Sequence, residues 1–192
     1  MRFVSKPAGK ESVGENFTRI GVVSGRFQPY HNRHQELLIE AMSKTDRLMV
    51  LVCDLPTFKY FPVKMLNSSA NLFSFEERRR MITNGLVDAG AREGSFDVRP
   101  FTEYMHHISK ERGSQELIYC VAGKGSVSRI ISGMFASFGN NVDKLDVKIT
   151  KEPSATQIRK LIIEEKRWEH LVPSSTVKII SRMHDLSQNC RF

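Results

Sequence analysis

Short apolar runs alternate along this chain with segments of helical spacing, and this alternation restricts the possible folds more than any other feature. The runs Arg19–Ser24 and Arg47–Cys53 are mainly apolar, as in parallel strands that are buried on both faces. Between them, His34–Ser43 carries apolar residues at helical spacing. A strand, a helix and a strand within this length indicate a right-handed βαβ unit.

The same alternation continues toward the C-terminus and predicts the rest of the fold. Two capping boxes, Ser74 with Glu77 and Ser154 with Gln157, mark helix starts. Further strands are expected at Phe96–Phe101, Leu117–Ala122 and Leu145–Thr150, and further helices at Phe75–Ala89, Glu103–Arg112, Ser126–Phe135, Thr156–Glu165 and Pro173–Leu186. We therefore predict an α/β fold, a doubly wound, Rossmann-like parallel sheet of about five strands with helices on both faces and a C-terminal helical segment.

The chain length fits one domain, because 192 residues with 40% hydrophobic residues are enough for a single core. We expect residues 1–18 to be a flexible polar leader and residues 19–192 to form a single domain. The segment Asp54–Asn71 lacks periodicity, so we expect a long loop bordering the functional site. In a doubly wound sheet, that site lies at the carboxyl ends of the strands.

The charge of the chain limits its ligands. The formal net charge is +8, so the surface attracts nucleic acid, acidic membranes or phosphorylated small molecules. The basic residues are spread along the chain and are not interleaved with aromatic residues, which favours small phosphorylated ligands and no nucleic acid. No run of 18 apolar residues and no signal-peptide pattern occur, so we expect no membrane partner and a cytoplasmic location. The cysteines Cys53, Cys120 and Cys190 are far apart, which argues against disulfides and structural zinc.

The string GRFQPYHNRH, residues 25–34, lies between the first expected strand and the first helix. A helix N-terminus and free backbone N–H groups face an incoming phosphate at such a turn. His31 and His34 are close enough in sequence to reach one triphosphate, and Arg26 adds a cation. Taken singly, the two histidines also fit surface residues or helix caps.

The whole string resembles the (H/T)xGH signature of the nucleotidylyltransferase superfamily. It is most similar to the GRFQPxHxGH form found in nicotinamide mononucleotide adenylyltransferases of the archaeal and bacterial bifunctional kinds. Arg33 stands where that pattern has glycine, which places a bulky cation next to the phosphates or turns it toward solvent. The resemblance implies nucleotide binding by Gly25, Arg26, Phe27 and Gln28.

A second string, EPSATQIRKLI at residues 152–162, resembles the ISxTxIR motif of the same family. Ser154 and Thr156 lie at a helix start, and Arg159 lies within the first turns, where its guanidinium reaches a phosphate. An ordinary capped amphipathic helix is the alternative for this segment alone. Weaker similarities cover residues 71–82, 123–135 and 167–180; the second of these implies nucleotide contacts by Gly123 and Lys124.

The resemblance implies transfer of AMP from ATP to nicotinamide mononucleotide, giving NAD and pyrophosphate. His31, His34 and Arg159 are the implied catalytic residues, with Ser154 and Thr156 holding the β and γ phosphates. Mg²⁺ is expected to bridge the ATP phosphates without a dedicated carboxylate cage. The family commonly assembles, so a homo-oligomer is expected.

The acceptor is an expectation from resemblance, because the family usually stacks the nicotinamide ring on a tryptophan in the middle of the chain. Trp168 lies in the C-terminal segment, where we expect packing. Tyr104, His106 and His107 are candidate replacements, or an ordinary exposed loop. Three alternatives remain: a sister enzyme that uses phosphopantetheine or CTP, a non-catalytic nucleotide-binding regulator, and a nucleic-acid-binding module.

Overall fold

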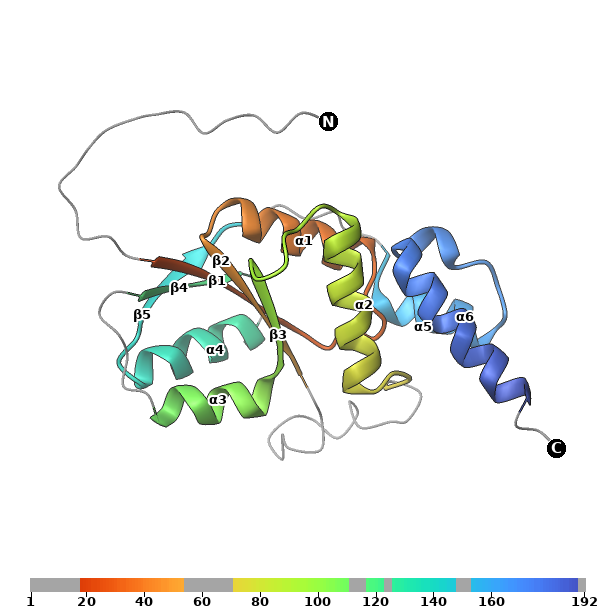
Figure 1. Cartoon of the computed structure of the whole chain (residues 1–192). Helices are drawn as coiled ribbons and strands as arrows, with labels where there is room; N and C mark the ends of the chain where they lie inside the picture. The colour runs from red at the N-terminus through yellow and green to blue at the C-terminus, as the bar shows by residue number, and fades with distance from the viewer. Residues whose placement is uncertain (1–17, 54–70, 111–116, 123–125, 148–152, 190–192) are drawn as a thin grey trace.

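The computed structural model describes residues 18–53, 71–110, 117–122, 126–147 and 153–189 (Figure 1). The strands are β1 Thr18–Gly25, β2 Arg47–Val52, β3 Phe96–Pro100, β4 Leu117–Ala122 and β5 Asn141–Leu145. The helices are α1 Asn32–Ser43, α2 Phe75–Asp88, α3 Phe101–Lys110, α4 Ser126–Ser137, α5 Ala155–Ile163 and α6 Ser174–Asn189, with a short 3-10 turn, η3, at Glu169–Leu171. The expected loop 54–71 and residues 1–17 lie almost entirely outside the described residues.

The strands form one five-stranded sheet in the order β3-β2-β1-β4-β5, and every neighbouring pair is parallel. This confirms the predicted doubly wound fold. The chain moves outward from β1 through β2 to β3, then crosses back to β4 on the other side of β1. The strand order therefore reverses beside β1, and doubly wound folds bind their ligands at the carboxyl ends of the strands at such a point.

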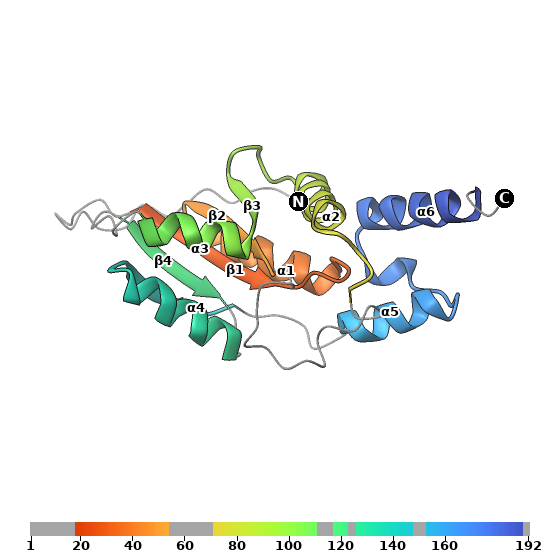
Figure 2. The ribbon, with the colours of Figure 1, turned by 90° about the horizontal axis from the view of Figure 1, so that it is seen from below.

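Helices cover both faces of the sheet because alternate strand residues point to opposite sides (Figures 1 and 2). In β1, Val23 belongs to a core cluster with residues of α1 and α2, whereas its neighbour Val22 belongs to a cluster with residues of α3 and α4. Both valines are at most 1% exposed. The near-continuous apolar runs of the central strands are thus explained by burial on two faces.

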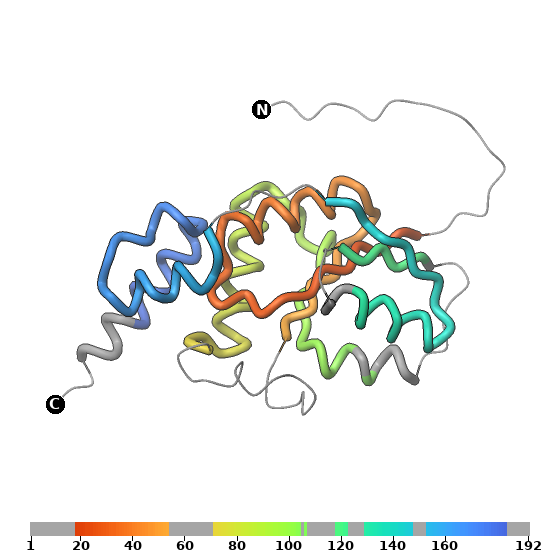
Figure 3. The backbone as a smooth tube through the Cα atoms, turned by 180° about the vertical axis from the view of Figure 1, so that it is seen from behind, coloured from red at the N-terminus to blue at the C-terminus, as the bar shows by residue number. Residues whose placement is uncertain are grey.

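The C-terminal helices extend beyond one end of the sheet, next to α2 (Figures 1 and 3). Ile180 of α6 is 6% exposed and joins the core cluster that contains α1 and α2. Trp168 is partly buried and packs against the same cluster, which confirms its expected packing role. No helix among the described residues combines the length and the apolar character needed to cross a bilayer.

One strand lies at a different place from the prediction. The pattern in Leu145–Thr150 suggested a strand, but β5 ends at Leu145. Helix α4 ends in a turn with Gly139 at a φ of +80°, and Asn141 then pairs at once with Ile118 of β4. The tertiary pairing therefore starts the strand early, and Val147 packs in the core cluster shared with α1 and α2. Residues 148–150 lie outside the described residues.

Candidate functional site

The turn that follows β1 is shaped by a buried aromatic ring. Phe27 is 1% exposed and has a φ of +50°, a left-handed conformation that side chains seldom adopt. A Cβ atom on Gly25 would lie 3.1 Å from the Phe27 ring, so glycine gives the ring its room. The Phe27 ring is therefore part of the core, where it packs within the cluster shared with α1 and α2.

His31 and His34 lie at the start of α1 as a stacked pair. Their ring centroids are 3.7 Å apart and the ring planes differ by 23°. His31 is the N-cap residue of α1, but its side chain makes no capping hydrogen bond and it is only 3% exposed. The Nδ1 atoms of both histidines are buried and have no hydrogen-bond partner among the residues that the structure describes. The His31 side chain is therefore buried and does not cap the helix, although its backbone occupies the N-cap position.

The surroundings of the pair keep both imidazoles neutral. Burial, with help from the positive charge of Arg33 and against the attraction of Glu36, lowers the pKa of His31 to about 4. Burial, followed by repulsion from His31 and Arg33, moves the pKa of His34 well below its usual value, and a hydrogen bond to the backbone of Pro29 opposes this shift. At neutral pH, each imidazole thus offers one N–H donor and no charge.

Arg159 of α5 joins the second motif to the first. It is 8% exposed, and its Nη1 donates to the carbonyl oxygen of Gln28 at 2.7 Å, across 131 residues of sequence. Its Nη2 donates to Oγ1 of Thr156 at 3.1 Å. Burial, and then repulsion from Arg26, lowers the pKa of Arg159. Two guanidinium groups therefore lie close enough to repel each other, in an arrangement that an anion would stabilise.

Gln28 is buried and its side chain is fully engaged in the protein. Its Nε2 donates to the carbonyl oxygen of Phe73 at 2.7 Å, and its Oε1 accepts from the Phe73 backbone N–H at 2.9 Å. With 1% exposure, this amide joins the turn after β1 to the segment before α2. In the structure this side chain holds the turn, and the nucleotide contact expected of Gln28 stays a prediction.

The two helix starts differ in how open they are to an anion. At α5, Oγ of Ser154 accepts from the Gln157 backbone N–H at 3.3 Å, and Gln157 Oε1 accepts from Ser154 N at 2.8 Å. This confirms the capping box and occupies the Ser154 hydroxyl. At α1, no side-chain cap and no acidic residue in the first turn are present. The start of α1 is therefore the more open anion site. Gly123 and Lys124 lie outside the described residues.

Sequence reasoning missed Arg78 and Asn71. Arg78 is 3% exposed, and its Nη1 donates to the carbonyl oxygens of Arg26 and Cys53, both at 2.9 Å. Nη2 of Arg26 donates to Oδ1 of Asn71 at 3.3 Å. The signal for Arg78 was present, because it shares a face of α2 with buried Met81, and a charged residue on an apolar face needs buried partners.

Two of the candidate replacements for the stacking tryptophan, Tyr104 and His106, differ in burial. Tyr104 is 8% exposed and stacks on Phe135, with ring centroids 6.2 Å apart, so its ring is part of the core and not an open stacking surface. His106 is exposed, and the side chain of His107 is not described. Among the described residues, no group of three metal-ligating side chains is found.

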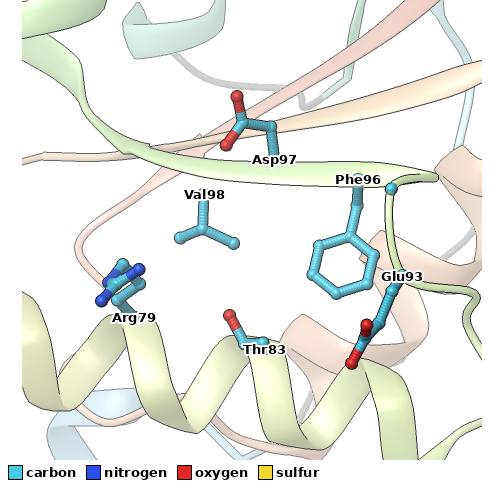
Figure 4. A pocket seen from close by; sticks show the side chains of 7 residues that line it. Arg79, Thr83, Glu93, Phe96, Asp97 and Val98 are labelled. Atoms are coloured by element: carbon cyan, nitrogen blue, oxygen red, sulfur yellow. The ribbon is translucent and has the colours of Figure 1, made fainter.

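A separate hollow of about 230 Å³ lies between α2 and the edge strand β3 (Figure 4). The side chains of Thr83, Phe96 and Val98 lie between the helix and the strand there. Its lining mixes these with Arg79, Glu93 and Asp97 and includes no residue of the turn after β1. This hollow therefore does not belong to the site built by His31 and Arg159.

The sequence matches the cytidylyltransferase-like family over residues 22–182. The chain belongs to the cytidylyltransferase-like family. This match confirms the predicted membership of the nucleotidylyltransferase superfamily and the predicted enzyme class. Both motifs, at residues 25–34 and 152–162, fall within the range that the cytidylyltransferase-like family covers.

Individual members of the family are moderately similar to this chain. The nicotinamide-nucleotide adenylyltransferase of Methanosarcina barkeri is 26% identical over 167 residues, which cover 85% of this chain and 88% of that protein. The phosphonoformate cytidylyltransferase of Streptomyces viridochromogenes is 25% identical over 176 residues, which cover 86% of this chain and 92% of that protein.

A solved structure confirms the fold independently. The bifunctional NMN adenylyltransferase/ADP ribose pyrophosphatase of Francisella tularensis, in complex with AMP and a manganese ion, superimposes with a TM-score of 0.60 at 18% identity. The alignment covers 88% of this chain and 50% of that one, so this chain spans about half the length of the bifunctional protein.

Proposed function

We propose that this chain is a nicotinamide-nucleotide adenylyltransferase, which transfers AMP from ATP to nicotinamide mononucleotide and releases pyrophosphate. The observation that carries the proposal is the meeting of the two motifs, where Arg159 donates to the Gln28 carbonyl beside the stacked His31 and His34. The naming of the Methanosarcina barkeri relative supports the choice of acceptor.

In the proposed reaction, a phosphate oxygen of nicotinamide mononucleotide attacks the α-phosphorus of ATP. The bond from that phosphorus to the bridging oxygen of the β-phosphate breaks, and pyrophosphate leaves with the electron pair. Such a transfer depends mainly on positioning and on neutralising charge, so it needs no protein nucleophile. His31 and His34 donate hydrogen bonds to the α-phosphate and the leaving pyrophosphate, while Arg159 and Arg26 balance their charge.

The donor set of the site fits a metal ion that arrives with the nucleotide. The site side chains are imidazoles, guanidiniums and hydroxyls, which favour phosphate oxygens over a bare divalent cation. Mg²⁺ is proposed as part of the ATP substrate, where it is held by the phosphates. The homo-oligomeric assembly, the cytoplasmic location and the single domain stay predictions from the sequence.

A second candidate function is a CTP-dependent transfer to a phosphorylated or phosphonate acceptor. The similar Streptomyces viridochromogenes protein is named a phosphonoformate cytidylyltransferase, and its identity of 25% is close to that of the archaeal relative. The two functions differ in the base of the nucleotide and in the acceptor, and not in the phosphate chemistry at His31 and His34.

The test is a matrix of nucleotide and acceptor. Purified protein is incubated with Mg²⁺ and either ATP or CTP, each with nicotinamide mononucleotide, phosphopantetheine or phosphonoformate, and pyrophosphate and the joined product are quantified by chromatography. We expect NAD and pyrophosphate in equal amounts with ATP and nicotinamide mononucleotide. Product only with CTP would support the second candidate, and bound ATP without pyrophosphate release would support a non-catalytic regulator.

A further inference from the structure

Arg78 is a buried cation at the site with no part in the reaction described above. It projects from α2, is 3% exposed, and its Nε donates to the carbonyl oxygen of Ser74 at 3.1 Å. A guanidinium keeps its charge at any physiological pH, and a buried charge costs several kcal/mol unless its donors are well satisfied. Because burial of this charge costs free energy, we expect the hydrogen bonds of Arg78 to serve a specific structural role.

The hydrogen bonds from Arg78 Nη1 are made where β1 and β2 separate. The two strands pair as far as Gly25 and Val52, and the backbone N–H of Cys53 still donates to the Gly25 carbonyl at 2.8 Å. Beyond this point the carbonyl groups of Arg26 and Cys53 leave the sheet. Nη1 of Arg78 donates to both of them at 2.9 Å, and so ties the two diverging chains together.

The segment from Asn71 to Arg78 also holds the side chains of the turn. Asn71 accepts from the Arg26 guanidinium at 3.3 Å, and the backbone of Phe73 holds the Gln28 amide from both ends. Arg26 is therefore fixed at its backbone by Arg78 and at its side chain by Asn71. Burial lowers the pKa of Arg26, because desolvation disfavours its charged form. A bound anion would stabilise the charge of this partly buried guanidinium.

We propose that Arg78 is a positioning residue for the nucleotide, because it fixes the backbone of Arg26 at the end of β1 and thereby aims the Arg26 side chain at the ATP phosphates. This inference rests on the proposed function only in that the chain binds ATP. The identity of the acceptor does not enter. Lysine cannot replace Arg78 fully, because it has one nitrogen and so cannot bind the Ser74 carbonyl, as Nε does, while it also binds the Arg26 and Cys53 carbonyls, as Nη1 does.

A double-mutant cycle tests the proposal. Arg78→Lys and Arg26→Ala are made singly and together, and the affinity for the Mg²⁺ complex of a non-hydrolysable α,β-methylene ATP is measured by calorimetry, beside kcat and KM. We expect Arg78→Lys to weaken binding about tenfold in the natural background and less than about twofold when Arg26 is already alanine, since residues in one network are not additive. Arg80→Met, an exposed arginine of the same helix, is the matched control.

The outcomes separate the two proposals. A natural chain that does not bind the ATP analogue contradicts the proposed function before any variant is compared. A natural chain that binds it, together with an equal loss from Arg78→Lys in both backgrounds, contradicts the positioning role alone. The positioning role is also contradicted if Arg78→Lys binds the ATP analogue as tightly as Arg80→Met does.

A second variant covers the case in which Arg78→Lys does not fold, as judged by its thermal unfolding. Asn71→Ala removes the other anchor of Arg26 and leaves the buried guanidinium in place. We expect it to weaken binding of the ATP analogue and to have no further effect in the Arg26→Ala background. A loss that persists there would show that residues 71–78 do not act through Arg26.

Discussion

Lowering the pH should destabilise the protein through His31. Folding lowers the pKa of this imidazole from 6.5 to about 4, chiefly by burial. The unfolded chain therefore binds the proton first, so stability is full above pH 6.5 and falls as the pH drops toward 4. Between pH 7.5 and pH 5.5, protonation of this imidazole in the unfolded chain raises the ratio of unfolded to folded protein about tenfold, which corresponds to a loss of about 1.4 kcal/mol of unfolding free energy.

Urea denaturation of the natural chain and of His31→Asn at pH 7.5 and 5.5 measures this loss. The variant lacks the titrating ring, so its decrease in unfolding free energy should be smaller by about 1.4 kcal/mol. His170→Asn, which removes an exposed imidazole on η3, is the control and should keep the decrease of the natural chain. Equal decreases for the natural chain and His31→Asn would refute the argument that His31 is neutral and buried in the folded state.

Three further changes test other parts of the structure. Gly85→Ala places a Cβ atom 2.7 Å from the buried ring of Tyr30, so urea denaturation should show a loss of about 1–3 kcal/mol, even though alanine favours helices. Ser154→Ala removes the capping box of α5 and should cost about 1 kcal/mol in the same assay. Arg159→Lys should lower kcat/KM for ATP about 30-fold, because hydrogen bonds to charged groups contribute about 2 kcal/mol; unchanged kinetics would exclude Arg159 from the site.

Local signals in the sequence were enough to predict most elements of the fold. The capping boxes at Ser74 and Ser154 depend on side chains three residues apart, and both are present in the structure. The strand expected at Leu145–Thr150 failed because its position depends on a turn at Gly139 and on pairing with β4. Local alternation carries no information about which partner a strand will meet.

The site, like the fold, was predicted where its residues lie in local motifs and was missed where they depend on tertiary contacts. His31 and Arg159 were predicted because each lies in a compact motif at a helix start. The roles of Gln28 and Arg78 were not predicted, because both side chains bind backbone groups of distant segments, whose position no side-chain pattern encodes. Tyr104 was a candidate replacement for the stacking tryptophan, and the sequence could not exclude it because its burial against Phe135 depends on the packing of α3 on α4.

The hydrogen bond from Arg159 to the Gln28 carbonyl has a consequence for the time at which the protein gains its activity. A ribosome adds about 5–20 residues per second, so roughly 7–26 seconds separate the synthesis of the two partners, which are 131 residues apart. Throughout that interval, the turn after β1 lacks the cation that completes it. A nascent chain should therefore pass most of its synthesis unable to retain nucleotide, and binding should begin only after α5 has docked.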